Sequence, residues 1–289
     1  MDGVLVIDKP KGPTSFDVVR QVRTLLKTKK AGHTGTLDPM ATGVLPICLG
    51  EATKVAGFIT EGDKAYDATV RLGVETDTQD AEGKVLSERP VPQLTAALLE
   101  AALAPFRGTF AQVPPMYSAV KVDGKRLYEL ARAGEEVERA SRQVTVYELT
   151  LRDFNATTLQ LSVRCSKGFF VRTLAYDLGR ALGCGAHLSA LRRTMSGPFV
   201  LAQSLPLAEL ANLAQDREAM AKRLQPLSEA LTHLPAVKVS AADATRVSHG
   251  VPVEAPPTPG KVRVLGPDGA VLAVAEVLNG RLRYLRVLV

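Results

Sequence analysis

Hydrophobic residues recur at regular intervals near the start of the chain and predict a strand followed by a helix. Residues 3–8 (GVLVID) form a short apolar run, which is typical of a buried strand. After the polar loop 8–15, Thr14 or Ser15 is suited to cap a helix. The apolar residues of this helix, spaced so that they share one face, are Phe16, Val19, Val22 and Leu26.

A glycine-rich segment separates this helix from the next apolar run. Residues 31–43 contain several glycines and alanines around a Leu-Asp-Pro turn, so we expect a loop that carries Asp38. Residues 44–50 (VLPICLG) are predicted to form a strand, and residues 51–60 (EATKVAGFIT) a short helix.

Strict alternation appears in the middle of the chain. Residues 64–74 place apolar side chains on one face of a predicted strand: Tyr66, Ala68, Val70 and Leu72. The acidic stretch 75–84 that follows reads as a solvated loop. A helix rich in alanine and leucine is expected over 94–104, and Asp123-Gly124 predicts a tight turn just before another helix.

Two long β-rich runs, residues 144–154 and 159–170, lead into a helix over 171–183. One face of that helix carries Leu174, Leu178 and Leu182. Residues 205–235 are rich in alanine, leucine and glutamate and are predicted to be helical.

The tail of the chain has a different pattern. Residues 261–289 contain short apolar runs separated by Pro-Asp-Gly and Asn-Gly turns, which are strong hairpin signals, and a proline-rich break at 256–260 precedes them. We therefore predict an α+β protein with two domains, a large one over 1–235 and a small β-rich one over 236–289. The arginines of the tail can serve RNA contact or plain solvation equally well.

Composition changes the picture in one respect. The hydrophobic share of 46% and the charged share of 23% are those of an ordinary globular protein, and no apolar run is long enough for a membrane helix or a secretion signal. The net charge is +6, and it is unevenly spread: residues 51–100 hold five basic and ten acidic side chains, whereas 151–200 hold seven basic and two acidic. Concentrated basic charge favours an RNA-binding face.

Common catalytic motifs are absent from the sequence. There is no phosphate-binding GxxxxGK[ST] motif, no HExxH and no GxSxG. The three cysteines and four histidines show no metal-ligand spacing, so we expect no metal, no cofactor and a cytoplasmic location. The remaining candidate is the single acid in GHTGTLDP, although Asp38 could equally form a simple turn before Pro39.

Several long segments are similar, in the same order, to the TruB family of tRNA pseudouridine synthases. The most specific is AGHTGTLDPMATGVLPICLGEATK at 31–54, in which the Asp of the LDP triplet is the family's catalytic residue. Further segments that resemble the family lie at 8–15, 63–83, 114–137 and 166–193. The resemblance implies a pseudouridine synthase domain with a mixed, largely antiparallel sheet flanked by helices, followed by a PUA-like RNA-binding domain.

Carried over by position, the resemblance implies a set of site residues. Asp38 is the nucleophile or acid/base, Tyr66 stacks on the target base and assists proton removal, and Arg172 is the basic partner of the catalytic carboxylate. His33 is implied to pack against the RNA near the flipped base, and Leu191 to lie beside the uracil. Lys9 and Pro10 match a DKP triplet to which we assign a structural role.

Phe170 departs from the family pattern. Many relatives have GTYIRT where this sequence has GFFVRT, so any contribution of a tyrosine hydroxyl at position 170 is lost while ring packing can persist. Candidate phosphate contacts come from the basic side chains near the predicted turns and strand ends: Lys121, Lys125, Arg126, Lys167, Arg192 and Arg193.

Isomerisation of uridine involves neither oxidation nor net hydrolysis, so the implied reaction needs no cofactor. The expected substrate is uridine 55 in the T stem-loop of tRNA, and the expected enzyme is a monomer that requires no protein partner and no membrane. Two alternatives stay open at this point. One is a guide-RNA-dependent pseudouridine synthase, and the other is an RNA-binding or RNA-folding protein with a vestigial active site.

Overall fold

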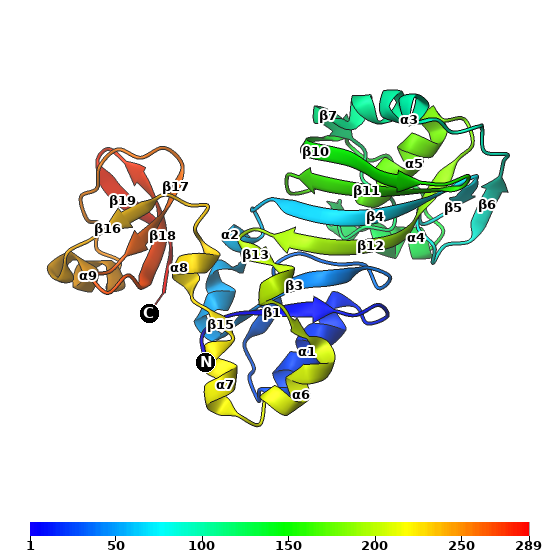
Figure 1. Ribbon diagram of the computed structural model, residues 1–289. Helices are drawn as coiled ribbons and strands as arrows, with labels where there is room; N and C mark the ends of the chain where they lie inside the picture. Colours follow the sequence, from blue (N-terminus) through cyan, green and yellow to red (C-terminus); the bar gives the residue numbers. More distant parts are fainter. Residues whose placement is uncertain (289) are drawn as a thin grey trace. The chain divides into compact units, whose positions relative to one another are not determined.

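The structure, a computed structural model, describes residues 1–288 and divides into two compact units (Figure 1). The first unit combines Met1–Gly62 with the chain from Met195 onward, and the second contains Asp63–Thr194. Both combine sheets with helices, so the predicted α+β class is confirmed.

The sheet of the first unit is built around two buried strands. β1 (Gly3–Lys9) pairs antiparallel with β3 (Thr42–Leu49) over its whole length. Nearly every side chain of both strands is buried, which explains why these runs are continuously apolar instead of alternating. Short strands extend this sheet: β2 (Ala31–His33) on β3, and β14 (Leu205–Pro206) and β15 (Leu224–Gln225) on β1.

α1 (Ser15–Leu25) begins where it was predicted to begin, but one of its apolar side chains, Phe16, faces the other way. The Thr14 hydroxyl accepts from the Asp17 backbone N–H while the Asp17 carboxylate accepts from the Thr14 backbone, which satisfies two free donors of the first turn. Val19 is buried as expected, but Phe16 is 61% exposed. The predicted inward position of Phe16 is therefore wrong, because Ser15 occupies that side of the first turn.

The segment 205–235 is less helical than predicted. It forms three short helices, α6 (Leu210–Leu213), α7 (Arg217–Lys222) and α8 (Leu227–Ala230). Strand β14 precedes them, β15 separates α7 from α8, and Pro226 stands at the start of α8. Earlier in the unit, α2 (Ala56–Ile59) follows a 3₁₀ turn as expected for residues 51–60. A two-residue strand, β13 (Phe199–Val200), pairs with the end of β12 (Ala186–Ser196).

The tail forms a separate four-stranded sheet. Its strands, in spatial order, are β16 (Ala236–Lys238), β17 (Lys261–Leu265), β18 (Val271–Leu278) and β19 (Arg281–Val287). Asn279 and Gly280 both have positive φ, so the predicted Asn-Gly hairpin turn is confirmed. α9 (Ala241–Ser248) contributes Val247 to the core of this sheet. Val274 also packs in one cluster with Val4 of β1, so the tail shares apolar contacts with the first sheet.

The second unit is dominated by long strands in the order β12–β4–β11–β10–β7 (Figure 1). They are β4 (Lys64–Leu72), β7 (Gly108–Gln112), β10 (Arg142–Phe154), β11 (Thr158–Cys165) and the larger part of β12. The pairings of β4 with β11, β11 with β10 and β10 with β7 are antiparallel, as predicted. α3 (Ala96–Leu103) and α5 (Val171–Ala181) supply fully buried leucines to its core, including Leu99 and Leu174.

The acidic stretch 75–84 is not the solvated loop that was predicted. β5 (Val74–Thr76) pairs with β6 (Val85–Glu88), and the turn between them folds inward. Asp80 is only 4% exposed and forms a parallel bridge with Leu188 of β12. The prediction from the charge pattern was wrong because one acid of the stretch, Asp80, pairs with a buried arginine, Arg172.

Candidate active site

Asp38 lies on a half-buried loop of the first unit whose backbone is held by a buried lysine. The Lys9 ammonium, which is fully buried, donates to the backbone oxygens of Pro10, Pro39 and Ala41 at 2.9, 3.2 and 2.7 Å. Two of these acceptors lie just after Asp38. Hydrogen bonds to a charged donor are stronger than neutral ones, so Lys9 fixes this loop to the end of β1.

The other side of the Asp38 loop is held by the first turn of α1. The Ser15 hydroxyl donates to the Leu37 oxygen at 3.0 Å and accepts from the Leu37 backbone N–H at 2.8 Å. Gly12 N–H donates to the Pro39 oxygen at 2.8 Å, and Ala41 N–H closes the turn onto the Asp38 oxygen at 3.0 Å. Asp38 therefore extends from a backbone with ordered contacts on both sides.

His33 is the last residue of β2, immediately before this loop, and not within the loop as expected. Its Nδ1 accepts from the Gly35 backbone N–H at 3.4 Å. This contact gives the ring a defined orientation at the start of GHTGTLDP.

Tyr66 and Leu191 lie in the second unit. Tyr66 is half-buried on β4, in the same alternating row as the buried Ala68 and Val70. Its strand partner is the buried Val163, so the ring shares the core-facing side of the sheet. Leu191 is 9% exposed on β12.

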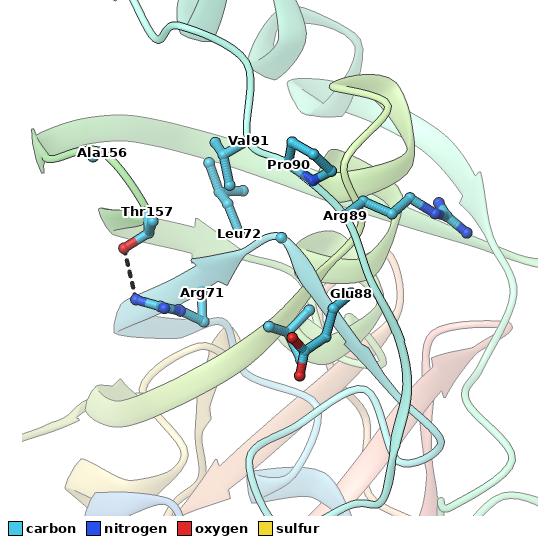
Figure 2. Close-up of a pocket in the computed structure, with 10 residues that line it drawn as sticks. Arg71, Leu72, Glu88, Arg89, Pro90, Val91, Ala156 and Thr157 are labelled. Atoms are coloured by element: carbon cyan, nitrogen blue, oxygen red, sulfur yellow. Dashed lines mark hydrogen bonds between the residues drawn. The ribbon is translucent and has the colours of Figure 1, made fainter.

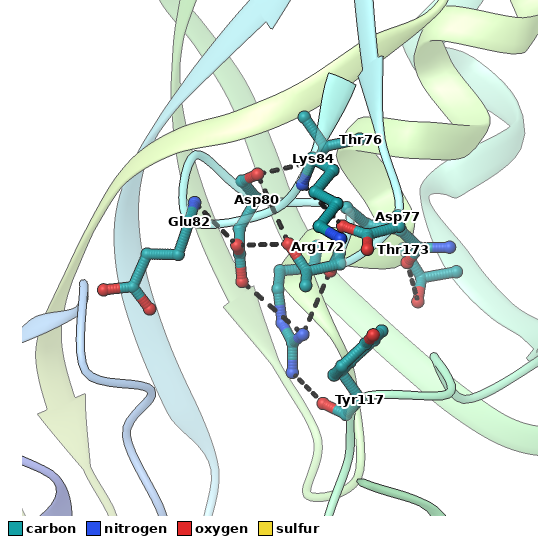
Figure 3. A network of polar contacts seen from close by, with 10 residues as sticks. Thr76, Asp77, Asp80, Glu82, Lys84, Tyr117, Arg172 and Thr173 are labelled. Carbon is teal, nitrogen blue, oxygen red and sulfur yellow. Dashed lines mark hydrogen bonds and ion pairs between the residues drawn. The ribbon is translucent and has the colours of Figure 1, made fainter. Parts of the chain in front are cut away.

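Arg172, in the first turn of α5, is the centre of a buried polar network (Figure 3). Its guanidinium lies 3.5 Å from the Asp80 carboxylate, and both side chains are 6% exposed. The same group donates to the backbone oxygens of Thr78 at 3.1 Å and Tyr117 at 2.7 Å. Two chain segments, the turn that contains Thr78 and Asp80 and the segment at Tyr117, thus converge on one cation, and Figure 3 shows them around it.

Asp80 is held as firmly as its partner. Its carboxylate accepts from the Thr78 hydroxyl at 2.6 Å and from the Glu82 backbone N–H at 3.0 Å. Its own backbone oxygen accepts from the Thr76 hydroxyl at 2.7 Å. A buried ion pair is stable only when further hydrogen bonds satisfy both charges, and this network supplies them.

The start of α5 is positioned by a buried amide. Gln112, 2% exposed at the end of β7, donates to the Phe170 oxygen at 3.1 Å and accepts from the Phe170 N–H at 2.8 Å. Phe169 is buried and meets Phe110 edge to face at 6.4 Å, whereas Phe170 is half-buried. The ring of Phe170 is therefore available for packing. Because Gln112 holds the Phe170 backbone, it also positions Arg172, which follows two residues later.

The basic residues predicted to bind phosphate divide into exposed and buried ones. Lys121, Lys125 and Arg126 are exposed on the hairpin of β8 (Lys121–Val122) and β9 (Lys125–Arg126), whose turn has positive φ at both central residues. Next to it, in α4 (Leu127–Arg132), Tyr128 receives a hydrogen bond from Arg126. Lys167 is exposed in the segment between β11 and α5. Arg193 is 1% exposed, so the expectation that it contacts phosphate from the surface is wrong.

A surface groove of about 580 Å³ lies at the other end of β4, around Leu72, Pro90 and Thr157 (Figure 2). Leu72 is six residues from Tyr66, which is roughly 20 Å along a strand. None of the candidate site residues lines this groove, so we do not assign it to the site.

Residues 1–288 contain no group of three or more histidine, cysteine, aspartate or glutamate side chains that could hold a metal ion. In the same range no helix is both long and apolar enough to cross a membrane.

Three family models match consecutive parts of the chain. The model described as "TruB family pseudouridylate synthase (N terminal domain)" matches residues 23–171. Those described as "tRNA pseudouridylate synthase B C-terminal domain" and "tRNA Pseudouridine synthase II, C terminal" match 172–232 and 234–289. The chain belongs to the TruB family of pseudouridine synthases.

Similar proteins cover nearly the whole of this TruB chain. The tRNA pseudouridine synthase B of Pseudomonas paraeruginosa is 49% identical over 283 residues, covering 96% of this chain and 93% of its own length. That of Chromohalobacter salexigens is 53% identical over 251 residues, covering 86% and 81%. A crystal structure of a Cbf5-Nop10-Gar1 complex contains a chain with a TM-score of 0.81 and 27% identity, covering 99% of this chain and 85% of that one.

Sequence reasoning on this TruB chain missed Asp80 and Gln112. Asp80 lies in a stretch that looks uniformly acidic, and Gln112 ends a short strand without any motif. The available signal for Asp80 was the single uncompensated arginine in an otherwise apolar helix start, VRTLA, which requires an acceptor somewhere in the fold. No sequence signal identifies which acid supplies it.

Proposed function

We propose that this protein converts uridine 55 in the T-loop of tRNA to pseudouridine, with Asp38 as its catalytic carboxylate. The observation that carries the proposal is the GHTGTLDP loop of a TruB chain, fixed on both sides of Asp38 by Lys9 and Ser15. A carboxylate whose backbone is already ordered meets the substrate without a further loss of conformational entropy.

The reaction breaks the N1–C1′ bond of the uridine and joins C5 of the same uracil to C1′. The hydrogen of C5 is lost and N1 gains one, so the overall change is an isomerisation that needs no oxidant, reductant or second substrate. Asp38 can act by attack at C1′, by addition at C6, or by assisting expulsion of uracil through a glycal. All three routes use the same carboxylate.

Tyr66 and Arg172 are proposed as the further catalytic residues. Tyr66 supplies an aromatic face for the base and a hydroxyl for proton removal, and Arg172 supplies a fixed positive charge for the carboxylate. The network with Asp80 and Tyr117 holds the Arg172 guanidinium in one orientation. Contacts to the flipped nucleotide are proposed for His33, Phe170 and Leu191.

Binding of the tRNA is proposed to use phosphate contacts from Lys121, Lys125, Arg126 and Lys167. These side chains are exposed. We further propose a catalytic domain over 1–235 and a PUA-like RNA-binding domain over 236–289. The protein is proposed to act as a monomer in the cytoplasm, on the T stem-loop, without a guide RNA or a protein partner.

The test compares the wild type with Asp38→Asn on an unmodified T stem-loop transcript, using chemical labelling that distinguishes pseudouridine from uridine. Asp38→Asn should bind the RNA with unchanged affinity and form no pseudouridine. Asp67→Asn is the matched control, because Asp67 is exposed on the opposite side of β4 from Tyr66 and should leave the product yield unchanged.

The same assay separates the alternatives. If the purified wild type forms no pseudouridine until a guide RNA or partner proteins are added, the standalone assignment is wrong. Substantial product from Asp38→Asn would refute the role of Asp38 and leave an RNA-folding function as the better account.

A further inference from the structure

Phe16 is exposed where the sequence pattern predicts that it is buried. It is 61% exposed in the first turn of α1, while Val19 and Val22 of the same predicted face are 2% and 0% exposed. A single exposed apolar side chain is ordinary on a protein surface and by itself carries no meaning. The position of this one relative to the Asp38 loop distinguishes it.

Phe16 is connected to the Asp38 loop by a short and ordered path. Its chain neighbour Ser15 is 2% exposed and makes two hydrogen bonds with the backbone of Leu37, the residue before Asp38. Two steps of about 3.8 Å between neighbouring Cα atoms and one side-chain contact therefore separate Phe16 from Asp38, on the order of 15 Å in all. The two residues belong to the same unit, and their separation is fixed by these bonds.

The surroundings of Phe16 suit a nucleotide. Arg20, one turn along α1, pairs with Asp17 at 2.7 Å but keeps a side chain that is 71% exposed. Lys11 is exposed in the loop whose Gly12 N–H donates to the Pro39 oxygen. An exposed aromatic ring beside cationic side chains is the usual combination in proteins that bind single-stranded nucleic acids. Extruding the target uridine also leaves a neighbouring base without a stacking partner, and an aromatic side chain can replace that partner.

We propose that Phe16 is an RNA-binding residue whose ring stacks on an unpaired base next to the flipped uridine. The proposal rests on the proposed function, since it takes the uridine at Asp38 as the target. It assigns Phe16 to binding of the loop and gives it no part in the chemistry.

The test measures the affinity of the wild type and three Phe16 variants for the T stem-loop transcript. Phe16→Ala and Phe16→Leu should raise the Kd about 5- to 100-fold, which corresponds to the loss of one base–aromatic stacking contact. Phe16→Tyr keeps the ring and should stay within about twofold of the wild type. Tyr147→Ala is the matched control, because Tyr147 is 46% exposed on β10 and has no assigned role.

Two further readouts separate stacking from a structural effect. The slope of log Kd against log salt should be the same for Phe16→Ala and the wild type, because no phosphate contact is removed. In addition, a transcript with 5-iodouridine at a loop position beside the target should form a photocrosslink that maps to Phe16.

The proposal is overturned if Phe16→Ala binds within twofold of the wild type, if Phe16→Tyr is as weak as Phe16→Ala, or if Tyr147→Ala weakens binding equally. Such a result with a wild type that still forms pseudouridine refutes only the role of Phe16. A wild type that forms none refutes the proposed function instead.

Discussion

Removing the charge of Asp80 should destabilise the second unit and slow the reaction. In Asp80→Asn the side-chain oxygen can still accept from Thr78 and Glu82, but an amide group then faces the Arg172 guanidinium. At 3.5 Å and an effective dielectric constant of about 20, the lost attraction is about 5 kcal/mol. Arg172 keeps the Thr78 and Tyr117 oxygens, so we expect a net cost of about 3 kcal/mol.

Thermal unfolding and single-turnover kinetics test this value. A loss of about 3 kcal/mol lowers the melting temperature of a domain of this size by about 6–12 °C. A guanidinium displaced by about 1 Å should also slow pseudouridine formation about 100-fold at saturating RNA. Asp77→Asn is the matched control: Asp77 accepts from the Lys84 N–H in the same turn, whereas the ion pair with Arg172 belongs to Asp80.

A double-mutant cycle with Arg172→Met completes the experiment. The two single variants and the double variant should show a coupling energy of about 2–3 kcal/mol in stability, as expected for a buried pair in direct contact. The reasoning is refuted if Asp80→Asn melts and reacts like the wild type, or if Asp77→Asn causes the same losses.

Two other substitutions, Lys64→Met and Gly179→Ala, test the packing of the second unit, and Gly57→Ala in the first unit is the control for the glycine change. Burial, with a smaller contribution from the charge of Arg193, lowers the pKa of Lys64 to about 8, so its ammonium destabilises the fold below pH 8 and this penalty disappears as pH rises toward the unfolded value of about 10.4. Lys64→Met should therefore be more stable than the wild type by up to about 3 kcal/mol at pH 7 and by much less at pH 10; an equal difference at both pH values in thermal unfolding would contradict the burial of this charge. Gly179→Ala would place a Cβ 2.2 Å from the Ala186 nitrogen and should cost about 3 kcal/mol, whereas Gly57→Ala, with no atom within 4 Å, should stabilise by about 0.5 kcal/mol; equal melting temperatures for the two variants would show that α5 can shift freely.

The sequence predicted those elements whose pattern depends only on near neighbours. The alternation of β4 and the Asn279-Gly280 turn were read correctly, because a half-buried strand and a left-handed turn each leave a local signature. The prediction that Phe16 is buried was wrong, because the spacing of apolar residues does not reveal a buried serine. Ser15 occupies the inward position at the start of α1, where its hydroxyl makes two hydrogen bonds with the Leu37 backbone.

The candidate site residues were proposed from the family resemblance and not from the sequence pattern. Asp38 alone could be any acid in a turn, and nothing local distinguishes Asp80 from the solvated acids around it. Its burial depends on Arg172, which is distant in sequence and joins it only once β12 and α5 are in place. Long-range pairs of this kind are a property of the fold and leave no periodic signal in the chain.

The bond from Arg172 to the Tyr117 oxygen has a mechanical consequence for the hairpin of β8 and β9. Tyr117 is followed directly by Ser118, whose oxygen accepts from the Tyr128 N–H, while Val120 accepts from Leu127. These bonds connect the hairpin to the start of α4, and the Arg172 guanidinium holds the backbone at Tyr117, just before the hairpin. If the hairpin binds a phosphate as proposed, that contact changes the freedom of Arg172, and by thermodynamic reciprocity the orientation of Arg172 changes the affinity of the hairpin for RNA by the same factor.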